Sequence, residues 1–275
     1  MTAVSTLAAA PAQIRTEVRD AVATVEISNP ARHNALSVAM MNDLAAALRA
    51  VDNDPEVRVV VLRGAGTKAF ASGADISEFP GHQDVDVRQA AEDAATALFT
   101  ELSALSVPVI ARIHGYCLGA GMALALGADI RCVDTRGVLA IPAARLGVGY
   151  PFEQTAALVQ TVGPATAADL LFTGRRLAAQ EAHATGLVDR VAEPEELEGV
   201  VGELAATIAA NAPLSVRAAK ATVRAVRRLS EGDQAAGDAA RQLAAQAVAR
   251  CRTSQDLLEG ARAFLEKRPP HFTGR

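Results

Sequence analysis

Three small residues between two apolar segments place the strongest constraint on how this chain can fold. Residues 107–113 are almost entirely apolar, which predicts a short buried strand. The triplet Gly119-Ala120-Gly121 follows, and an apolar segment ending at Asp129 predicts a helix that opens inside it. Small residues let another molecule approach the backbone, and the unpaired N–H groups of a first helical turn can hold an oxyanion. The triplet alone leaves two interpretations open, ligand binding and close packing of helix on strand.

The composition limits the core and the partners. Half of the 275 residues are hydrophobic, but only 3% are aromatic and Trp is absent, so Ala, Val and Leu must build the core. The length predicts one or two domains. A net charge of −4 argues against nucleic acid as the main partner. Local basic groups remain able to meet an anionic ligand.

The cysteines and the apolar runs predict a cytoplasmic protein. Cys117, Cys132 and Cys251 are widely separated and form no C-x-x-C motif, so we expect reduced core residues and no metal site. A nucleophilic role for Cys117 would need a base, and only His114 is near in sequence. The longest apolar run ends at Asp129, short of the roughly 20 residues that span a membrane. Residues 1–13 lack a basic segment and are expected to be a disordered tail.

Segments typical of strands alternate with segments typical of helices up to about residue 190. The predicted strands are 14–18 and 22–27, which form a hairpin across Arg19-Asp20, and 57–62, 107–113, 129–133 and 138–141. Helices are predicted after a capping Ser37, over 84–106 and from the glycine triplet, and 64–75 is predicted to be a loop. The alternation predicts an α/β core over residues 14–190 with parallel strand pairing.

The remaining chain is predicted to be mostly helical. Helices are expected over 155–162, 164–172, 178–185, 195–211, 213–229 and 234–251, with a brief strand at 188–191 and a last helix from the capping Ser254 to Lys267. Ala-rich helices with a narrow apolar stripe commonly pack against neighbours. We therefore expect residues 191–275 to form a helical oligomerisation region.

A second small-residue loop, Lys68 to Ile76, follows a buried strand. Together with the glycine triplet, it resembles the crotonase (enoyl-CoA hydratase/isomerase) family. Further motifs agree in the same order, from about residue 16 to the C-terminus. They are Asn29-Pro30, Asn34-Ala35-Leu36-Ser37, His114-Gly115-Tyr116, Ala128-Asp129-Ile130-Arg131, Leu171-Phe172-Thr173-Gly174, Glu181-Ala182, Gly186-Leu187-Val188 and Ala263-Phe264-Leu265-Glu266-Lys267-Arg268.

The resemblance implies an α/β spiral of ββα units with a helical C-terminal trimerisation region. It also implies a homotrimer or a dimer of trimers. The substrate would be an acyl-CoA thioester, so coenzyme A enters as part of the substrate and no separate cofactor is expected. The backbone N–H groups of Ala74 and Ala120 would hold the thioester oxygen and stabilise an enolate. Donors fixed where negative charge develops contribute about 2.7–4 kcal/mol each.

The same resemblance assigns a coenzyme-binding role to two further segments. Phe264 and Lys267 would reach the coenzyme of a neighbouring subunit. Taken alone, Lys267 also fits an ordinary cation in the last turn of a helix. The coenzyme loop would be lined by Ser72, Asp75, Ile76 and Ser77.

The chain departs from the family pattern at both acid/base positions. Hydratases of this family use two glutamates, one just after the glycine triplet and one after a Pro about twenty residues later. Here those positions hold Ala123 and Ala143. General acid–base groups typically contribute about 10²–10⁴-fold to a rate, and an alanine methyl contributes none of it. Ordinary enoyl-CoA hydration and double-bond isomerisation are therefore not expected.

Two polar residues remain near the expected acyl pocket. The run from Leu146 to Tyr150 partly resembles the methylmalonyl-CoA decarboxylase branch, although that branch carries His at the position of Ala74. Decarboxylation needs no protein base, and Tyr150 could bind the carboxylate or relay a proton; otherwise it forms a pocket wall with its hydroxyl on a carbonyl. Glu153 could be a displaced acid/base residue or a surface group that complements a helix dipole.

The expected activity is that of an acyl-CoA thioester enzyme of fatty acid metabolism that works through an enolate without either usual glutamate. Three possibilities stay open: a decarboxylase of a short malonyl-type CoA thioester, an unusual hydratase (a lyase) or isomerase that uses Glu153 or Tyr150, and a noncatalytic acyl-CoA binder. Outside the expected pocket, His82 could have a catalytic role. His114 is expected to be packed in the core, and Asp129 to bind nearby backbone.

Overall fold

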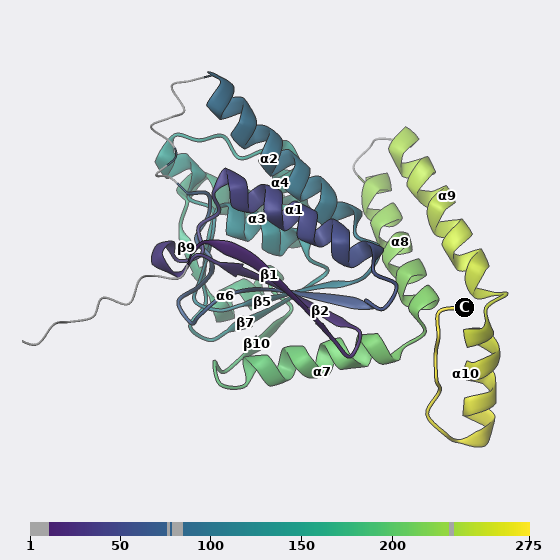
Figure 1. Cartoon of the computed structure of the whole chain (residues 1–275). Coiled ribbons are helices and arrows are strands. Elements are labelled where there is room, and N and C mark those ends of the chain that lie inside the picture. The colour runs from purple at the N-terminus through teal and green to yellow at the C-terminus, as the bar shows by residue number, and fades with distance from the viewer. Residues whose placement is uncertain (1–10, 76–77, 79–84, 231–233) are drawn as a thin grey trace, which may run out of the picture.

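The computed structural model describes residues 11–75, 78, 85–230 and 234–275, and in this part of the chain two sheets lie at the centre (Figure 1). The large sheet has the order β1-β2-β3-β5-β7-β10, and the small sheet the order β4-β6-β8-β9. The strands are β1 (Gln13–Arg19), β2 (Val22–Ser28), β3 (Val59–Gly64), β4 (Ala69–Ala71), β5 (Val109–Ile113), β6 (Tyr116–Leu118), β7 (Ile130–Asp134), β8 (Val138–Ala140), β9 (Arg176–Ala178) and β10 (Arg190–Ala192).

Most strand pairs are parallel, as the sequence predicts. β1 and β2 form the expected antiparallel hairpin, and Asp20 and Ala21 turn the chain with φ of 50° and 63°. From β2 onward, every pair in the large sheet is parallel. The large sheet begins at Gln13, the first residue of β1, and ends at Ala192, the last residue of β10. The predicted core covers residues 14–190.

The predicted spiral of ββα units is visible in how the two sheets are connected. β3 and β4, then β5 and β6, then β7 and β8 each place the first strand in the large sheet and the second in the small one. A helix follows the first two pairs, α2 (Val85–Ala104) and α3 (Ala120–Gly127). The prediction of a loop over 64–75 was wrong at Ala69–Ala71, because a three-residue strand is too short to show an alternating pattern.

Both faces of the large sheet are covered. Val60 and Leu62 of β3 pack into the main core, while Val59 and Val61 pack beneath α7 (Leu197–Ala210). Figure 1 shows α1 (Val38–Asn53) and α2 over one face and α7 along the other. Burial on both sides explains why this strand is apolar without alternation.

The remaining helices are α4 (Phe152–Val162), α5 (Pro164–Thr173), α6 (Ala179–Ala184), α8 (Pro213–Ser230), α9 (Gln234–Cys251) and α10 (Gln255–Glu266). α8 packs along α9, and Figure 1 shows α9 and α10 on the far side of α8 from the sheets. Ser254 caps α10 as predicted, through a 3.1 Å bond from the N–H of Leu257. In the described chain no single helix is long and apolar enough to cross a membrane, although α7 and α8 pass that test together across a 108° bend.

Candidate active site

The two small-residue loops singled out by the sequence meet at one edge of the small sheet. β4 and β6 are parallel neighbours, so the chain leaves both strands at the same edge. A methyl group on Gly73 would lie 3.3 Å from the carbonyl oxygen of Leu118 and 3.8 Å from the nitrogen of Ala120. Gly73 has φ +112° and Gly119 has φ +53°, which is backbone that favours glycine. The sheet therefore brings Ala74 and Ala120 together.

The N–H groups of these two alanines are both unused by the backbone around them. Ala74 pairs with Leu36 in a parallel bridge, where Leu36 N donates to Gly73 O and Asp75 N donates to Leu36 O, each at 2.8 Å. In that pattern the N–H of Ala74 points away from Leu36. Ala120 is the first residue of α3, so its N–H has no acceptor within the helix. Among the described residues, neither N–H donates to a backbone carbonyl.

The glycines of the triplet have separate tasks. Gly119 makes the turn into α3, with φ +53° and ψ −114°. Gly121 is helical, and a methyl group there would lie only 2.2 Å from the carbonyl oxygen of Ala71. The packing interpretation of the triplet is therefore correct for Gly121, while the geometry at Gly119 positions the N–H of the next residue.

The positions of the family's two glutamates hold small apolar side chains. Ala123 is buried in α3, and Ala143 packs against the main core at the start of the 3-10 turn Ala143–Leu146. Ala123 is buried and Ala143 half-buried, and neither methyl group can transfer a proton. The described residues also contain no cluster of three or more His, Cys, Asp or Glu side chains that could hold a metal.

Tyr150 turns its side chain into the protein. Its ring packs against the main core, and its hydroxyl is buried without a hydrogen-bond partner among the described residues. Burial raises the pKa of Tyr150, and the Cys117 thiol on β6 raises it further, so the hydroxyl keeps its proton. The backbone-carbonyl partner that a purely structural Tyr would use is not found. An unpaired buried hydroxyl costs about 1–3 kcal/mol, which makes this side chain a candidate for a ligand contact.

The first turn of α4 holds one residue that sequence reasoning missed. Glu153 is exposed there, as expected for a carboxylate that complements a helix dipole. Gln154 instead turns inward, and its Oε1 atom is buried without a partner in the described chain. No sequence pattern separates Gln154 from its neighbour, since only the rotation of α4 decides which side chain faces inward.

Ser72 and Asp75, assigned to the coenzyme loop, are anchored to the segment after β2. The Ser72 hydroxyl donates to the carbonyl oxygen of Arg32 at 3.0 Å, and Arg32 forms an ion pair with Asp75 at 2.8 Å. The Arg32 side chain is half-exposed beside this loop, and no sequence motif had singled it out. The other two predicted residues of the loop, Ile76 and Ser77, and the candidate His82 lie outside the described residues.

Phe264 and Lys267 lie on a different part of the molecule. Phe264 is 83% exposed on α10, and Lys267 forms the C-cap of that helix with φ 54°. Figure 1 places α10 away from α3 and its turn. Within one chain, these two residues are therefore not brought together with Ala74 and Ala120.

The remaining candidates from the sequence are structural. Asp129 Oδ2 accepts from the N–H of Val109 at 2.7 Å, as predicted. His114 is buried, which lowers its pKa to about 4 together with the charge of Arg112. Cys117 is fully buried, and burial raises the pKa of its thiol, which disfavours the thiolate that a nucleophile needs.

Comparison with known proteins agrees with this geometry. A family model described as Enoyl-CoA hydratase/isomerase matches residues 17–275. The chain is 34% identical to a crotonyl-CoA hydratase of Syntrophomonas wolfei over 261 residues, covering 94% of this chain and 97% of the relative. It is 35% identical to a carnitinyl-CoA dehydratase of Proteus mirabilis over 259 residues, covering 94% and 97%.

Solved structures show the same fold. A crystal structure of an enoyl-CoA hydratase/carnithine racemase from Magnetospirillum magneticum superposes with a TM-score of 0.87 at 35% identity, covering 95% of this chain and 96% of that one. The enoyl-CoA hydratase of Bacillus anthracis gives a TM-score of 0.85 at 33% identity, covering 95% and 99%. With one family model matching nearly the whole chain and relatives aligned from end to end, this protein belongs to the enoyl-CoA hydratase/isomerase, or crotonase, family.

Proposed function

We propose that this protein converts acyl-CoA thioesters through an enolate whose oxygen is held by the N–H groups of Ala74 and Ala120. The observation that carries the proposal is that the Gly73 and Gly119 turns lie close together, and that neither following N–H group donates to a backbone carbonyl among the described residues. Two such donors are each worth about 2.7–4 kcal/mol to a developing oxyanion. Both are backbone groups, so alanine at 74 and 120 is compatible with this role.

The relatives support a coenzyme A thioester as the substrate. Two of them are named as a crotonyl-CoA hydratase and a carnitinyl-CoA dehydratase, which act on different acyl groups attached to the same coenzyme. Coenzyme A then enters with the substrate. Ser72, Asp75, Ile76 and Ser77 are the proposed loop contacts to it.

The reaction itself differs from ordinary hydration in this proposal. Adding water to an enoyl thioester needs a base for the water and a proton for the α-carbon. Ala123 and Ala143 supply neither, and Glu153 is exposed at the first turn of α4. Glu153 stays a candidate only if substrate binding brings it to the acyl group.

Decarboxylation of a short malonyl-type thioester is the second candidate, and the buried Tyr150 hydroxyl favours it. The bond between the α-carbon and the carboxylate breaks, CO₂ leaves, and the electron pair moves into the enolate held by Ala74 and Ala120. A proton then adds to the α-carbon. Tyr150 keeps its proton because burial raises its pKa, so its hydroxyl can donate a hydrogen bond or relay a proton from water.

Incubation with crotonyl-CoA and with methylmalonyl-CoA, followed by mass spectrometry of the products, tests these reactions. Loss of CO₂ from methylmalonyl-CoA with little hydration of crotonyl-CoA is the expected result. Hydration at the rate of an ordinary hydratase would refute the importance of Ala123 and Ala143. Tight binding of several thioesters with no turnover would identify a noncatalytic acyl-CoA binder.

We also propose a homotrimer or a dimer of trimers in which α10 carries Phe264 and Lys267 to the coenzyme of a neighbouring subunit. Large apolar side chains are exposed along the C-terminal helices: Val223, Val226, Leu243, Leu257, Leu258, Phe264 and Leu265. Sedimentation velocity should give a trimer or hexamer. Lys267→Gln should weaken coenzyme A binding without changing the sedimentation coefficient. A wild-type monomer that binds coenzyme A normally would contradict the proposed contact from a neighbouring subunit.

A further inference from the structure

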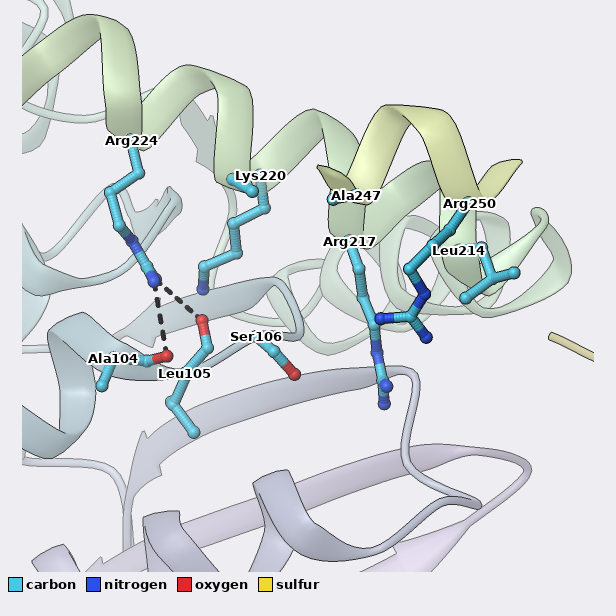
Figure 2. A pocket seen from close by; sticks show the side chains of 10 residues that line it. Ala104, Leu105, Ser106, Leu214, Arg217, Lys220, Arg224, Ala247 and Arg250 are labelled. Atoms are coloured by element: carbon cyan, nitrogen blue, oxygen red, sulfur yellow. Dashed lines mark hydrogen bonds between the residues drawn. The ribbon is translucent and has the colours of Figure 1, made fainter. Parts of the chain in front are cut away.

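A cleft of about 240 Å³ lies between the end of α2 and helices α8 and α9 (Figure 2). Its lining includes four basic side chains, Arg217, Lys220 and Arg224 from α8 and Arg250 from α9. None of the described residues that line it is acidic. This concentration of positive charge is unusual for a protein with a net charge of −4.

Two of the four cations already have partners. Lys220 Nζ donates to Val107 O at 2.6 Å and to Asp129 Oδ2 at 2.8 Å. Arg224 donates to the carbonyl oxygens of Ala104 and Leu105 at 3.3 Å and 2.7 Å, as the dashed lines in Figure 2 show. These contacts tie α8 to the end of α2 and explain why both side chains are held in place.

The other two cations are unpaired in the described chain. The side chains of Arg217 and Arg250 form no ion pair or hydrogen bond there, and Arg217 Nε is buried without an acceptor. Figure 2 shows the Arg217 side chain extending away from α8 and the Arg250 side chain extending from α9 in the direction of Arg217. A guanidinium cannot lose its proton in a protein, so a buried N–H of this kind needs an acceptor from outside the chain.

Nearby carboxylates do not supply that acceptor. Asp52 Oδ1 already accepts from the N–H and the hydroxyl of Ser106, at 2.7 Å and 2.8 Å. Asp129 is paired with Lys220. Four cations thus face two carboxylates, both of them engaged. Burial lowers the pKa of Lys220 against the opposing effect of Asp129, and the charge of Arg224 lowers it further, as expected where positive charge is in excess.

We propose that this cleft binds a small oxyanion of the phosphate class, held by the guanidinium groups of Arg217 and Arg250. One water molecule needs only about 10–15 Å³ of such volume, so a cleft of about 240 Å³ has room for phosphate or pyrophosphate. Planar guanidinium groups match the oxygen geometry of such anions better than an ammonium does.

The site is separate from the proposed active site. Asp129 lies just past the end of α3, whereas Ala120 opens that helix. An eight-residue helix is about 12 Å long, so the two sites lie at opposite ends of α3. The inference does not rest on the proposed function.

Isothermal titration of the full-length protein with inorganic phosphate and with pyrophosphate, at fixed ionic strength in chloride, tests the proposal. The wild-type protein should bind at least one of the two anions. Arg217→Gln and Arg250→Gln should each weaken binding about tenfold or more, because each removes charge-assisted hydrogen bonds. Arg217→Lys keeps the charge, so its affinity for the anion should lie between those of the wild type and Arg217→Gln. Arg241→Gln, an exposed position on the same helix α9, is the matched control and should bind like the wild type.

Competition with coenzyme A identifies the source of the anion. If coenzyme A displaces phosphate from the wild-type cleft and Arg217→Gln loses one coenzyme-binding site, the two results together would show that the cleft binds the phosphate groups of the coenzyme. Failure to displace indicates a free oxyanion. Absence of binding to the folded wild-type protein overturns the proposal, as does equal binding by wild type and both glutamine variants. If the wild-type protein binds no anion and Arg250→Gln changes the sedimentation coefficient, the partner of these arginines is instead a carboxylate of a second copy of the chain.

Discussion

A methyl group added to Gly119 would lie 3.8 Å from the Cα of Gly73, so two turns that are 46 residues apart in sequence (119 − 73) approach within the width of one side-chain methyl group. Each turn is followed by an alanine whose N–H is unpaired. The contact depends on the parallel pairing of β4 and β6, which ends both strands at one edge of the small sheet.

Replacing Ala120 by proline should remove one of the two proposed donors and keep the helix. Proline lacks an N–H and is tolerated at the first position of a helix, which Ala120 occupies in α3. Turnover of any accepted thioester should fall about 10²–10³-fold, as for loss of one oxyanion donor. Ala120→Gly keeps the N–H and should stay close to wild type. Steady-state kinetics with circular dichroism measures both, and full activity in a folded Ala120→Pro enzyme would remove this N–H from the mechanism.

Gly121→Ala should destabilise the protein although alanine favours helices. The new methyl group would meet the carbonyl oxygen of Ala71 at 2.2 Å, and overpacking of this kind costs about 1–3 kcal/mol. Gly199→Ala in α7 is the control, because no atom lies within 4 Å of the added methyl group. That variant should gain about 0.5–1 kcal/mol. Urea unfolding compares the two, and equal midpoints would contradict the packing argument.

Tyr150→Phe should separate stability from activity. The change removes a buried hydroxyl that has no partner in the described chain, so the free energy of unfolding should stay constant or rise by about 1 kcal/mol. Activity that uses this hydroxyl as an acid should fall about 10²–10⁴-fold. The half-exposed Tyr116 provides the control, since Tyr116→Phe should change neither quantity. A Tyr150→Phe enzyme with unchanged turnover would show that the hydroxyl has no part in the reaction.

His114 should make the protein less stable in mild acid. Its pKa is lowered from 6.5 to about 4 by burial and by the charges of Arg112 and Arg63. Between those pH values the unfolded chain binds a proton that the folded chain does not, so stability falls as the pH decreases from 6.5 to about 4 and is constant below that. The expected loss is about 3 kcal/mol, at about 1.4 kcal/mol for each pKa unit.

The measurement is the free energy of unfolding by urea at several pH values. His114→Gln should flatten the slope between pH 6.5 and 4, where this histidine titrates. The exposed His271 serves as the control, since His271→Gln should keep the wild-type slope. Identical slopes in wild type and His114→Gln would show that another group is responsible.

Local patterns determined much of the architecture. The hairpin turn at Asp20, the caps at Ser37 and Ser254 and a buried strand over Val59 to Leu62 were all predicted correctly, because each depends on residues near in sequence. The family motifs also located Ala74 and Ala120, and the positions that Ala123 and Ala143 fill. The resemblance of these motifs to the crotonase family therefore indicated the family and the departure from its usual acid/base residues.

The tertiary structure decided what no local pattern encodes. β4, β6 and β9 have three residues each, too few to show a period, and only their pairing in the small sheet brings Gly73 to Gly119. The rotation of α4 turned Gln154 inward and left Glu153 outside. The basic cleft joins residues as distant as Ala104 and Arg250. Sequence patterns record which residues share an element, whereas burial and unpaired polar atoms follow from how elements far apart in the chain pack together.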